Sequence, residues 1–255
     1  MTAPVPVDAP TPPAQLFSLA AHELRTPMGV VAGYLKMLLG ERGGVLAPEQ
    51  RRLVEAADRS AARIVDVLAE LSDLARLDAG LAQLARVPAD LGELLHETVQ
   101  HIAPTARRVF IDIEGFDAPT PILVDADRLR RALRAVVDAV VRETPDGERV
   151  SVRGLRVDAA PLLAGWPSPL RQADRAADGS AGGFVAVDVI EARFDPILVG
   201  ASEPRLAWLD ETRGGLGLAL PIARRLFDAE GGALWSPANR DQASGFAFVL
   251  PVRRT

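Results

Sequence analysis

A predicted helix from Gln15 to Leu39 most constrains this chain, because its apolar residues recur at alternating steps of four and three. These positions are Phe17, Ala21, Leu24, Met28, Val31, Leu35 and Leu38. Such a heptad seam is typical of a helix that packs lengthwise against other helices. A second segment, from about Glu49 to Leu77, repeats the pattern at Leu53, Ala57, Ala61, Ile64, Leu68, Leu71 and Ala75. We therefore predict two antiparallel helices, joined by a glycine-rich turn over residues 40–48.

The histidine at position 22 lies just outside the seam of the first helix. With Ala21 in the seam, the imidazole of His22 is expected to point toward water, and Thr26 lies one turn further on the same face. Pro27 removes one helical hydrogen bond, at a cost of roughly 3 kcal/mol, and leaves the carbonyl of Glu23 without its usual partner. A soluble helix that keeps this flaw beside an exposed histidine favours a reactive histidine over a structural one.

The run from His22 to Pro27, His-Glu-Leu-Arg-Thr-Pro, resembles the phosphoacceptor box of bacterial sensor histidine kinases, whose usual form is H-E-L/I-R-T/N-P. The resemblance implies that His22 carries a phosphoryl group on nitrogen, that Glu23 moves a proton, and that Thr26 positions water for dephosphorylation of a partner. Arg25 and Pro27 would support them. These residue types suit the chemistry, because a neutral imidazole is a nucleophile and a neighbouring carboxylate accepts the released proton.

Composition limits the class of protein. The 255 residues, 48% of them hydrophobic, suit one large or two modest domains. The formal net charge of −5 argues against nucleic-acid binding, and no window approaches the ~20 apolar residues of a membrane span. The absence of cysteine indicates a reducing cytoplasm. With three histidines we expect no metal site, and we read residues 1–13, which are proline-rich, as a disordered tail rather than a signal peptide.

The apolar stripes of the two helices are too wide to cover each other, since Val54, Val67 and Leu74 widen the second one. Pairing with a second copy would close a four-helix bundle, so we predict a homodimer. The sequence before Gly80, Ala75 to Ala79, resembles the end of the dimerisation domain of histidine kinases. We therefore assign residues 14–82 to a dimerisation and phosphoacceptor domain.

From about Val87 the pattern changes to mixed strands and helices. We predict helices at 91–102, 127–143 (capped by Asp125) and within 214–230, and strands at 109–113, 122–125, 150–157, 184–190 and 245–252. This order resembles the ATP-binding α/β sandwich of histidine kinases, with a Pro/Gly/Ala-rich insertion at 158–183. The expected fold is thus an N-terminal helical hairpin forming a dimeric four-helix bundle, followed by an ATPase-like sandwich over 87–255. The resemblance covers almost the whole chain.

Compared with the family, the predicted nucleotide site departs at its metal-binding position. The helix after Asp125 matches the family pattern at Asp125, Arg128, Leu129 and Leu133. Ala135 and Ala139 stand where the family has two asparagines, and Arg142 holds the basic position. The second asparagine binds magnesium in the family, whereas an alanine offers no oxygen ligand. Asp138 lies one residue away and is turned about 100° from the required direction.

The adenine-binding and phosphate-binding positions differ in how well they match. Glu191 stands where the family has an adenine-reading aspartate, so an acceptor is retained, but Arg193 and Asp195 replace two glycines. Close approach of the backbone to a ligand is thereby lost. The glycine-rich loop survives at Gly214, Gly215 and Gly217, where backbone amides would cradle phosphate, although packing against the sheet explains these glycines equally well.

Three functions are compatible with these patterns. In the first, His22 accepts phosphoryl groups from, and passes them to, aspartates of response-regulator receiver domains, and the second domain has impaired ATP use. The second is an active ATP-dependent autokinase with an unusual nucleotide site, and the third is a non-catalytic pseudokinase scaffold. The complete phosphoacceptor box argues against the third, and the two alanines argue against the second. We predict the first, with receiver domains, an upstream kinase and a second copy as partners. We expect that no cofactor is required, and we leave open whether ATP binds with magnesium.

Overall fold

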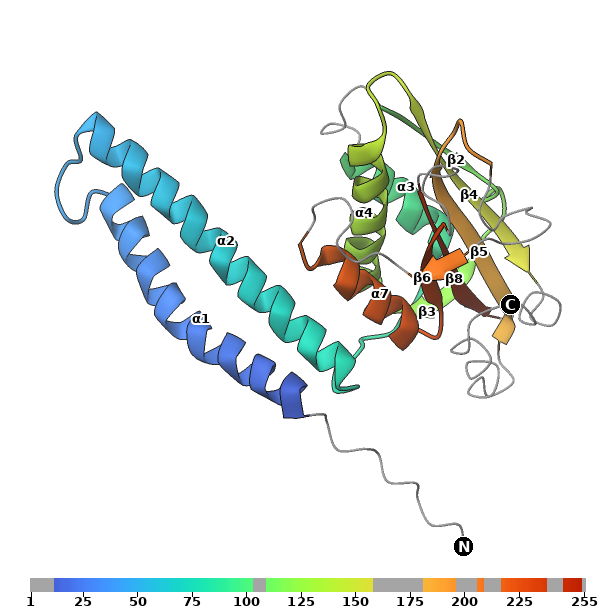
Figure 1. The fold of residues 1–255 in the computed structure, drawn as a ribbon, viewed down its shortest axis with the longest axis horizontal. Coiled ribbons are helices and arrows are strands. Elements are labelled where there is room, and N and C mark those ends of the chain that lie inside the picture. Colours follow the sequence, from blue (N-terminus) through green and yellow to red (C-terminus); the bar gives the residue numbers. More distant parts are fainter. Residues whose placement is uncertain are drawn as a thin grey trace, which may run out of the picture. The chain divides into compact units, whose positions relative to one another are not determined.

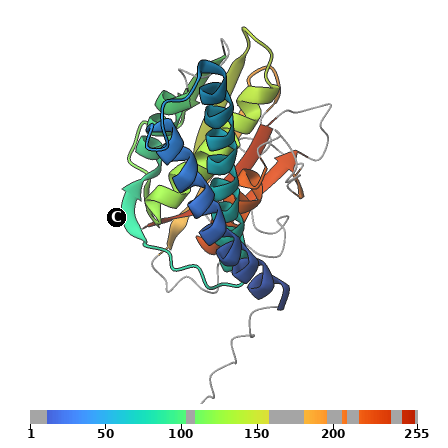
Figure 2. The ribbon, with the colours of Figure 1, turned by 90° about the vertical axis from the view of Figure 1, so that its left-hand side faces the viewer.

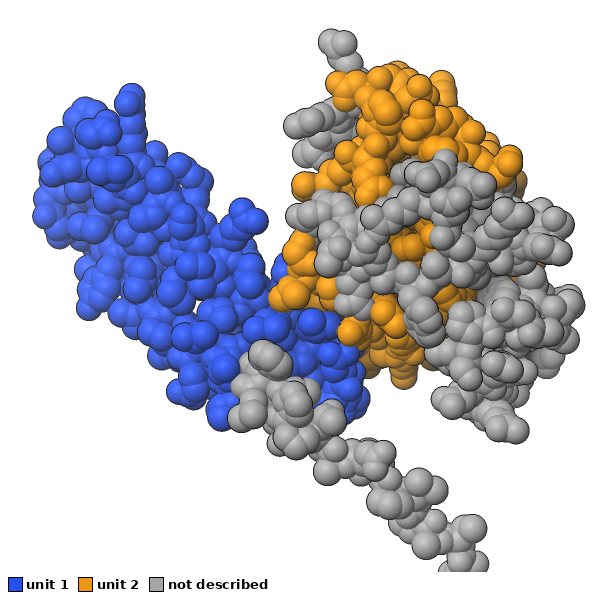
Figure 3. Space-filling view, in the orientation of Figure 1, with its two compact units in different colours: residues 1–82 blue, residues 83–255 orange. Residues whose placement is uncertain are grey.

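The computed structural model describes residues 12–102, 109–157, 181–195, 206–208, 217–237 and 245–253. It divides into two compact units, residues 1–82 and residues 83–255 (Figure 3). Among the described residues, no helix combines the length and the apolar character that crossing a membrane requires.

The first unit is a helical hairpin. Helix α1 (Pro12–Leu39) contains Pro27, and helix α2 (Pro48–Asp78) runs beside it (Figures 1 and 2). Proline at the first position of α2 loses no helical hydrogen bond, and the Gln50 side chain accepts the backbone N–H of Ala47 at 3.0 Å. After α2, Gly80 adopts a φ of 66°, which favours glycine and ends the helix. Both predicted helices are confirmed to within a few residues.

The hairpin covers only part of its apolar seams. Ala21 of α1 and Ala61 and Leu68 of α2 are buried, so these positions pack within the hairpin. Other seam or stripe positions remain between 44% and 65% exposed in the single chain: Leu24, Val31, Leu53, Ile64 and Val67. The side chain of Phe17, also assigned to the seam, lies outside the described residues. Packing within the hairpin therefore buries some of the apolar seam residues and leaves others exposed to solvent.

The second unit is built on a mixed six-stranded sheet with strand order β2-β4-β5-β8-β7-β6. Its strands are β2 (Phe110–Glu114), β4 (Arg149–Val157), β5 (Ala181–Glu191), β8 (Gly245–Arg253), β7 (Ala233–Pro237) and β6 (Leu206–Trp208). Strands β2 and β4 are parallel, and the other neighbours are antiparallel. A separate antiparallel pair consists of β1 (Val87–Asp90) and β3 (Pro121–Val124).

The described residues of this unit also form the helices α3 (Leu91–Ile102), α4 (Ala126–Glu143) and α7 (Ala219–Ala229) (Figure 1). Their apolar residues share one core with valines of β4 and β5 and phenylalanines of β8. The rings of Phe227 and Phe248, for example, lie 4.7 Å apart between α7 and β8. Helix α4 begins at a cap, where the Asp125 carboxylate accepts the backbone N–H of Arg128 at 3.2 Å. The predicted hairpin followed by an α/β sandwich is confirmed, as is this cap.

Strands β1, β6 and β7 were not predicted. Strand β1 has four residues and includes Pro88, and all five residues of β7 are buried, so neither shows the alternation that identifies a half-buried strand. Part of the predicted insertion at 158–183 belongs to β5, which begins at Ala181. The remainder, residues 158–180, lies outside the described residues, as do residues 1–11 of the predicted tail.

Gly232 is a position where the neighbouring backbone leaves no room for a side chain. A Cβ atom there would collide with the carbonyl oxygen of Val249 in the neighbouring strand. We expect Gly232→Ala to lower the unfolding free energy of residues 83–255 by about 1–3 kcal/mol, because the backbone must shift. Tryptophan fluorescence during urea unfolding measures this, since all three tryptophans lie in that unit. Gly33→Ala, whose new methyl group would meet nothing within 4 Å, should leave the same transition unchanged.

Candidate functional site

The first candidate site lies on the water-facing surface of α1. His22, Glu23 and Thr26 are all exposed, and Pro27 beside them is exposed as well. Arg25 is half-buried, and the preceding Ala21 is fully buried against the hairpin. The heptad pattern therefore places the histidine where a partner's reactive group has access. A helix of this length fixes the relation between the three polar residues, because positions i and i+4 share a face.

The other two histidines are placed differently. His96 and His101 are on α3, and each has its Nδ1 atom 2.7 Å from the carbonyl oxygen four residues earlier, Gly92 and Glu97 respectively. That contact fixes the ring against its own helix. Neither ring has an adjacent proline within the helix, so the sequence context of His22 is not repeated.

The predicted nucleotide-binding positions of α4 carry no metal ligand. Ala139 is fully buried in the core and Ala135 nearly so, and their methyl groups have no oxygen to offer a magnesium ion. Asp138, the nearest carboxylate in the sequence, pairs with Arg134 at 3.5 Å on the same helix. Arg142 is half-buried in the last turn of α4. These residues do not fit the magnesium site that the family resemblance implies.

Glu191, the last residue of β5, is a buried carboxylate with only 1% of its surface exposed. Its Oε1 atom lies 2.6 Å from Nε of Arg193, and Nη2 of Arg193 donates to Oε2 at 3.3 Å. Burial raises the pKa of Glu191 above its ordinary value, and Arg193 only partly offsets this. The pairing with Arg193 was not predicted, because it depends on the geometry of the turn after β5.

The raised pKa of Glu191 gives a stability prediction with a defined sign. A carboxylate whose folded pKa is raised costs stability when it ionises, so the cost is present above the raised pKa and disappears as the pH falls through it. We expect Glu191→Gln to unfold at a higher urea concentration than the natural protein at pH 7. The difference should shrink as the pH is lowered. A variant less stable at pH 7 would show that the pairing with Arg193 outweighs burial.

The remaining predicted positions are only partly described. Gly217 is exposed just before α7, with a φ of 63°, and a side chain there would meet no atom within 4 Å of its Cβ. Gly214 and Gly215 lie outside the described residues. Within the described part of the chain, no hydrogen bond or ion pair joins Arg142, Glu191 and Gly217.

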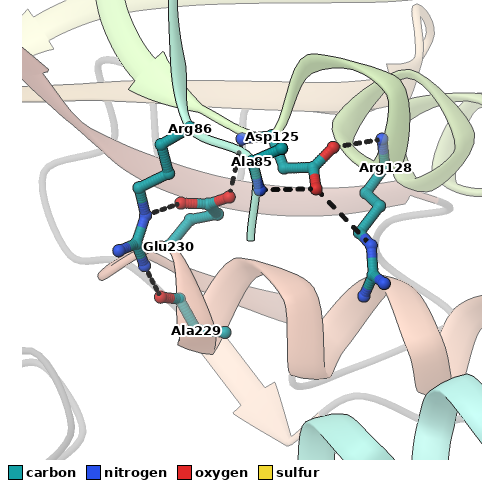
Figure 4. A network of polar contacts seen from close by, with 6 residues as sticks. All are labelled: Ala85, Arg86, Asp125, Arg128, Ala229 and Glu230. Atoms are coloured by element: carbon teal, nitrogen blue, oxygen red, sulfur yellow. Dashed lines mark hydrogen bonds and ion pairs between the residues drawn. The ribbon is translucent and has the colours of Figure 1, made fainter. Parts of the chain in front are cut away.

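A buried polar network ties the start of the second unit to its interior (Figure 4). The Glu230 carboxylate, fully buried after α7, accepts Nε of Arg86 at 2.7 Å and the backbone N–H of Asp125 at 2.8 Å. Arg86 also donates to the carbonyl oxygen of Ala229 at 2.7 Å. No sequence signal pointed to this contact, because Arg86 and Glu230 are 144 positions apart.

The same network includes the cap of α4. The Asp125 carboxylate accepts the backbone N–H of Ala85 at 3.2 Å, and its Oδ2 atom lies 3.5 Å from Nε of Arg128 (Figure 4). The Asp125 carboxylate thus caps α4 and also binds the segment that precedes β1. Together the two acids hold residues 85–86 against α4 and the end of α7.

Comparison with known proteins gives one family match and several relatives that cover most of the chain. Residues 14–80 match the family model of the His Kinase A (phospho-acceptor) domain. The Sensor protein GacS of Pseudomonas syringae pv. syringae is 25% identical over 235 residues, which are 91% of this chain and 24% of that protein. Residues 14–80 thus resemble a histidine kinase phospho-acceptor domain, and most of the chain resembles a bacterial sensor protein.

Two further proteins are similar over most of this chain. The alginate biosynthesis sensor protein KinB of Pseudomonas aeruginosa is 22% identical over 239 residues, 91% of this chain and 36% of KinB. The crystal structure of full-length ShkA in complex with AMPPNP superposes with a TM-score of 0.64 at 23% identity, covering 94% of this chain and 46% of ShkA. This likeness shows that the chain has the fold of ShkA. The chain spans 24% of the length of its GacS relatives.

Proposed function

We propose that this chain is a two-component signalling protein in which His22 accepts phosphoryl groups from, and donates them to, aspartates of response-regulator receiver domains. The observation that carries the proposal is the complete His-Glu-Leu-Arg-Thr-Pro run on the exposed face of α1, within the matched phosphoacceptor domain. An imidazole on that face is accessible to another protein without movement of the hairpin.

The transfer step is a displacement at phosphorus. A ring nitrogen of His22 attacks the phosphorus of an aspartyl phosphate, a P–N bond forms, the P–O bond to the aspartate breaks, and its carboxylate leaves with the electron pair. The ring proton passes to Glu23, the adjacent exposed carboxylate. In the reverse direction the proton returns to the ring. Thr26, one turn away, would orient water when a receiver is dephosphorylated.

A second copy of the chain is part of this proposal. The uncovered apolar side chains of α1 and α2, including Leu24, Leu53 and Ile64, lie on long helices and suit pairing with another hairpin. A homodimeric four-helix bundle would cover them and leave His22, outside the seam, accessible on each copy.

Impaired ATP use is also proposed. It is supported by the buried methyl groups of Ala135 and Ala139, which supply no oxygen where the family resemblance calls for a magnesium ligand. Without that ion, the charge of a triphosphate would lose much of its stabilisation during transfer. We keep an active autokinase as the alternative for two reasons. The Glu191 carboxylate can still accept a hydrogen bond from adenine, and ShkA, which has the same fold, crystallised with AMPPNP.

The proposal is tested by giving the protein two phosphoryl donors separately. Incubation with receiver domains that carry a labelled aspartyl phosphate should transfer label to the chain, whereas labelled ATP with magnesium should transfer little. Strong labelling from ATP would instead support the autokinase. Labelling from neither donor, over a broad panel of receivers, would support a pseudokinase scaffold.

A further inference from the structure

The end of β5 carries a buried carboxylate whose partner comes from its own turn. Glu191 pairs in register with Val150 of β4, and residues paired in this way share a face of the sheet. Val150 belongs to the core that the helices α3, α4 and α7 complete, so the Glu191 side chain lies on the helix-covered side. Its Oε1 atom accepts no hydrogen bond from the described residues, although Nε of Arg193 lies 2.6 Å away in ion-pair contact.

The turn after β5 holds Arg193 on this carboxylate. The backbone N–H of Phe194 donates to the carbonyl oxygen of Glu191 at 3.0 Å, and that of Ala192 donates to the carbonyl oxygen of Arg149 at 2.8 Å. The guanidinium lies 4.9 Å from the centre of the Phe194 ring. The Arg193 side chain is 55% exposed, whereas Glu191 is buried beneath it. Arg193 therefore forms the outer layer over the acid and has room to swing away.

We infer that Arg193 occupies the position of a ligand base on Glu191 and acts as a built-in competitor of nucleotide binding. A guanidinium is planar and offers N–H donors in one plane, and the amino edge of a nucleobase offers the same type of donor. Both groups need the same carboxylate oxygens, so a base that binds Glu191 must displace Arg193. This inference rests on the proposed function, in which the second unit keeps a nucleotide-binding fold but uses ATP poorly.

The test compares the natural protein with Arg193→Ala by calorimetric titration of AMPPNP in the presence of EDTA, so that magnesium ligands do not enter. Loss of the ion pair should tighten AMPPNP binding about tenfold. Inorganic triphosphate, which has no base, should bind both proteins equally. The control variant is Arg149→Ala, which removes an exposed arginine that also pairs with an acid, Asp112 at 2.8 Å, and lies over a ring, Phe110 at 5.3 Å. It should leave AMPPNP affinity unchanged.

Two outcomes overturn the inference. One is AMPPNP binding that is unchanged, weaker or undetectable after Arg193→Ala in a variant whose thermal unfolding shows a folded second unit. The other is an equal gain for triphosphate, which would mean a general charge effect. Label transfer from receiver domains to His22 needs neither Glu191 nor Arg193, so that experiment decides the proposed function independently.

Discussion

Replacing His22 with alanine is expected to reduce phosphoryl acceptance from receiver domains to background. The alanine methyl group has no nucleophilic nitrogen, and the side chain it replaces is exposed and makes no core contact, so the hairpin should fold normally. Because removing a nucleophile eliminates the covalent step, we expect a loss of more than about a thousandfold in transfer rate. Labelled receiver phosphate, chased onto the chain and followed over time, measures it.

The other two histidines provide the control. His96→Ala and His101→Ala each remove an imidazole that contacts its own helix on α3, and both variants should accept label at the natural rate. If His22→Ala still acquired acid-labile, base-stable label, while one of these variants did not, the phosphoacceptor would have been assigned to the wrong residue. Circular dichroism of all three variants establishes that the helices are intact.

The second large effect is expected at Glu230. Glu230→Ala should lower the unfolding free energy of residues 83–255 by about 3 kcal/mol, because the buried N–H of Asp125 loses its acceptor and Arg86 loses its carboxylate partner. For a unit of this size that corresponds to a fall of roughly 10 °C in the midpoint of thermal unfolding. Tryptophan fluorescence again reports this unit alone, since residues 1–82 contain no tryptophan.

A surface ion pair provides the comparison for Glu230. Asp112 pairs with Arg149 at the same short range, 2.8 Å, but both side chains are about half exposed. Asp112→Ala should therefore cost less than about 1 kcal/mol, because water already screens the pair. Equal losses in the two variants would mean that burial of the Glu230 network contributes nothing beyond a surface contact.

The sequence predicted features that depend on residues close together in the chain, and it missed features that depend on residues far apart. The hairpin was predictable because a heptad repeat is local, and the exposure of His22 followed from its place beside Ala21. The cap at Asp125 was local as well. Strand β7 was not predictable. It pairs with β8 and all of its residues are buried, so its sequence lacks the alternation of apolar and polar residues that marks a half-buried strand.

Two contacts of the candidate site show the same limit. The sequence analysis noted only that Arg193 replaces a glycine of the family pattern. Its position over Glu191 depends on a turn whose geometry the residue types do not specify. The contact between Arg86 and Glu230 joins residues 144 positions apart, so no pattern within a short stretch of sequence could show it. In both cases the residues were visible in the sequence but their partners were not.

The position of the Glu230 network has a practical consequence for isolating the second unit as a fragment. Ala85 and Arg86 precede the first strand, β1, which begins at Val87. A fragment cut at that strand would leave one buried acid without its cation and remove a backbone donor from another. Expression plasmids for the isolated sandwich should therefore encode residue 83 onward, and loss of solubility on trimming to residue 87 would reveal how much those few residues contribute.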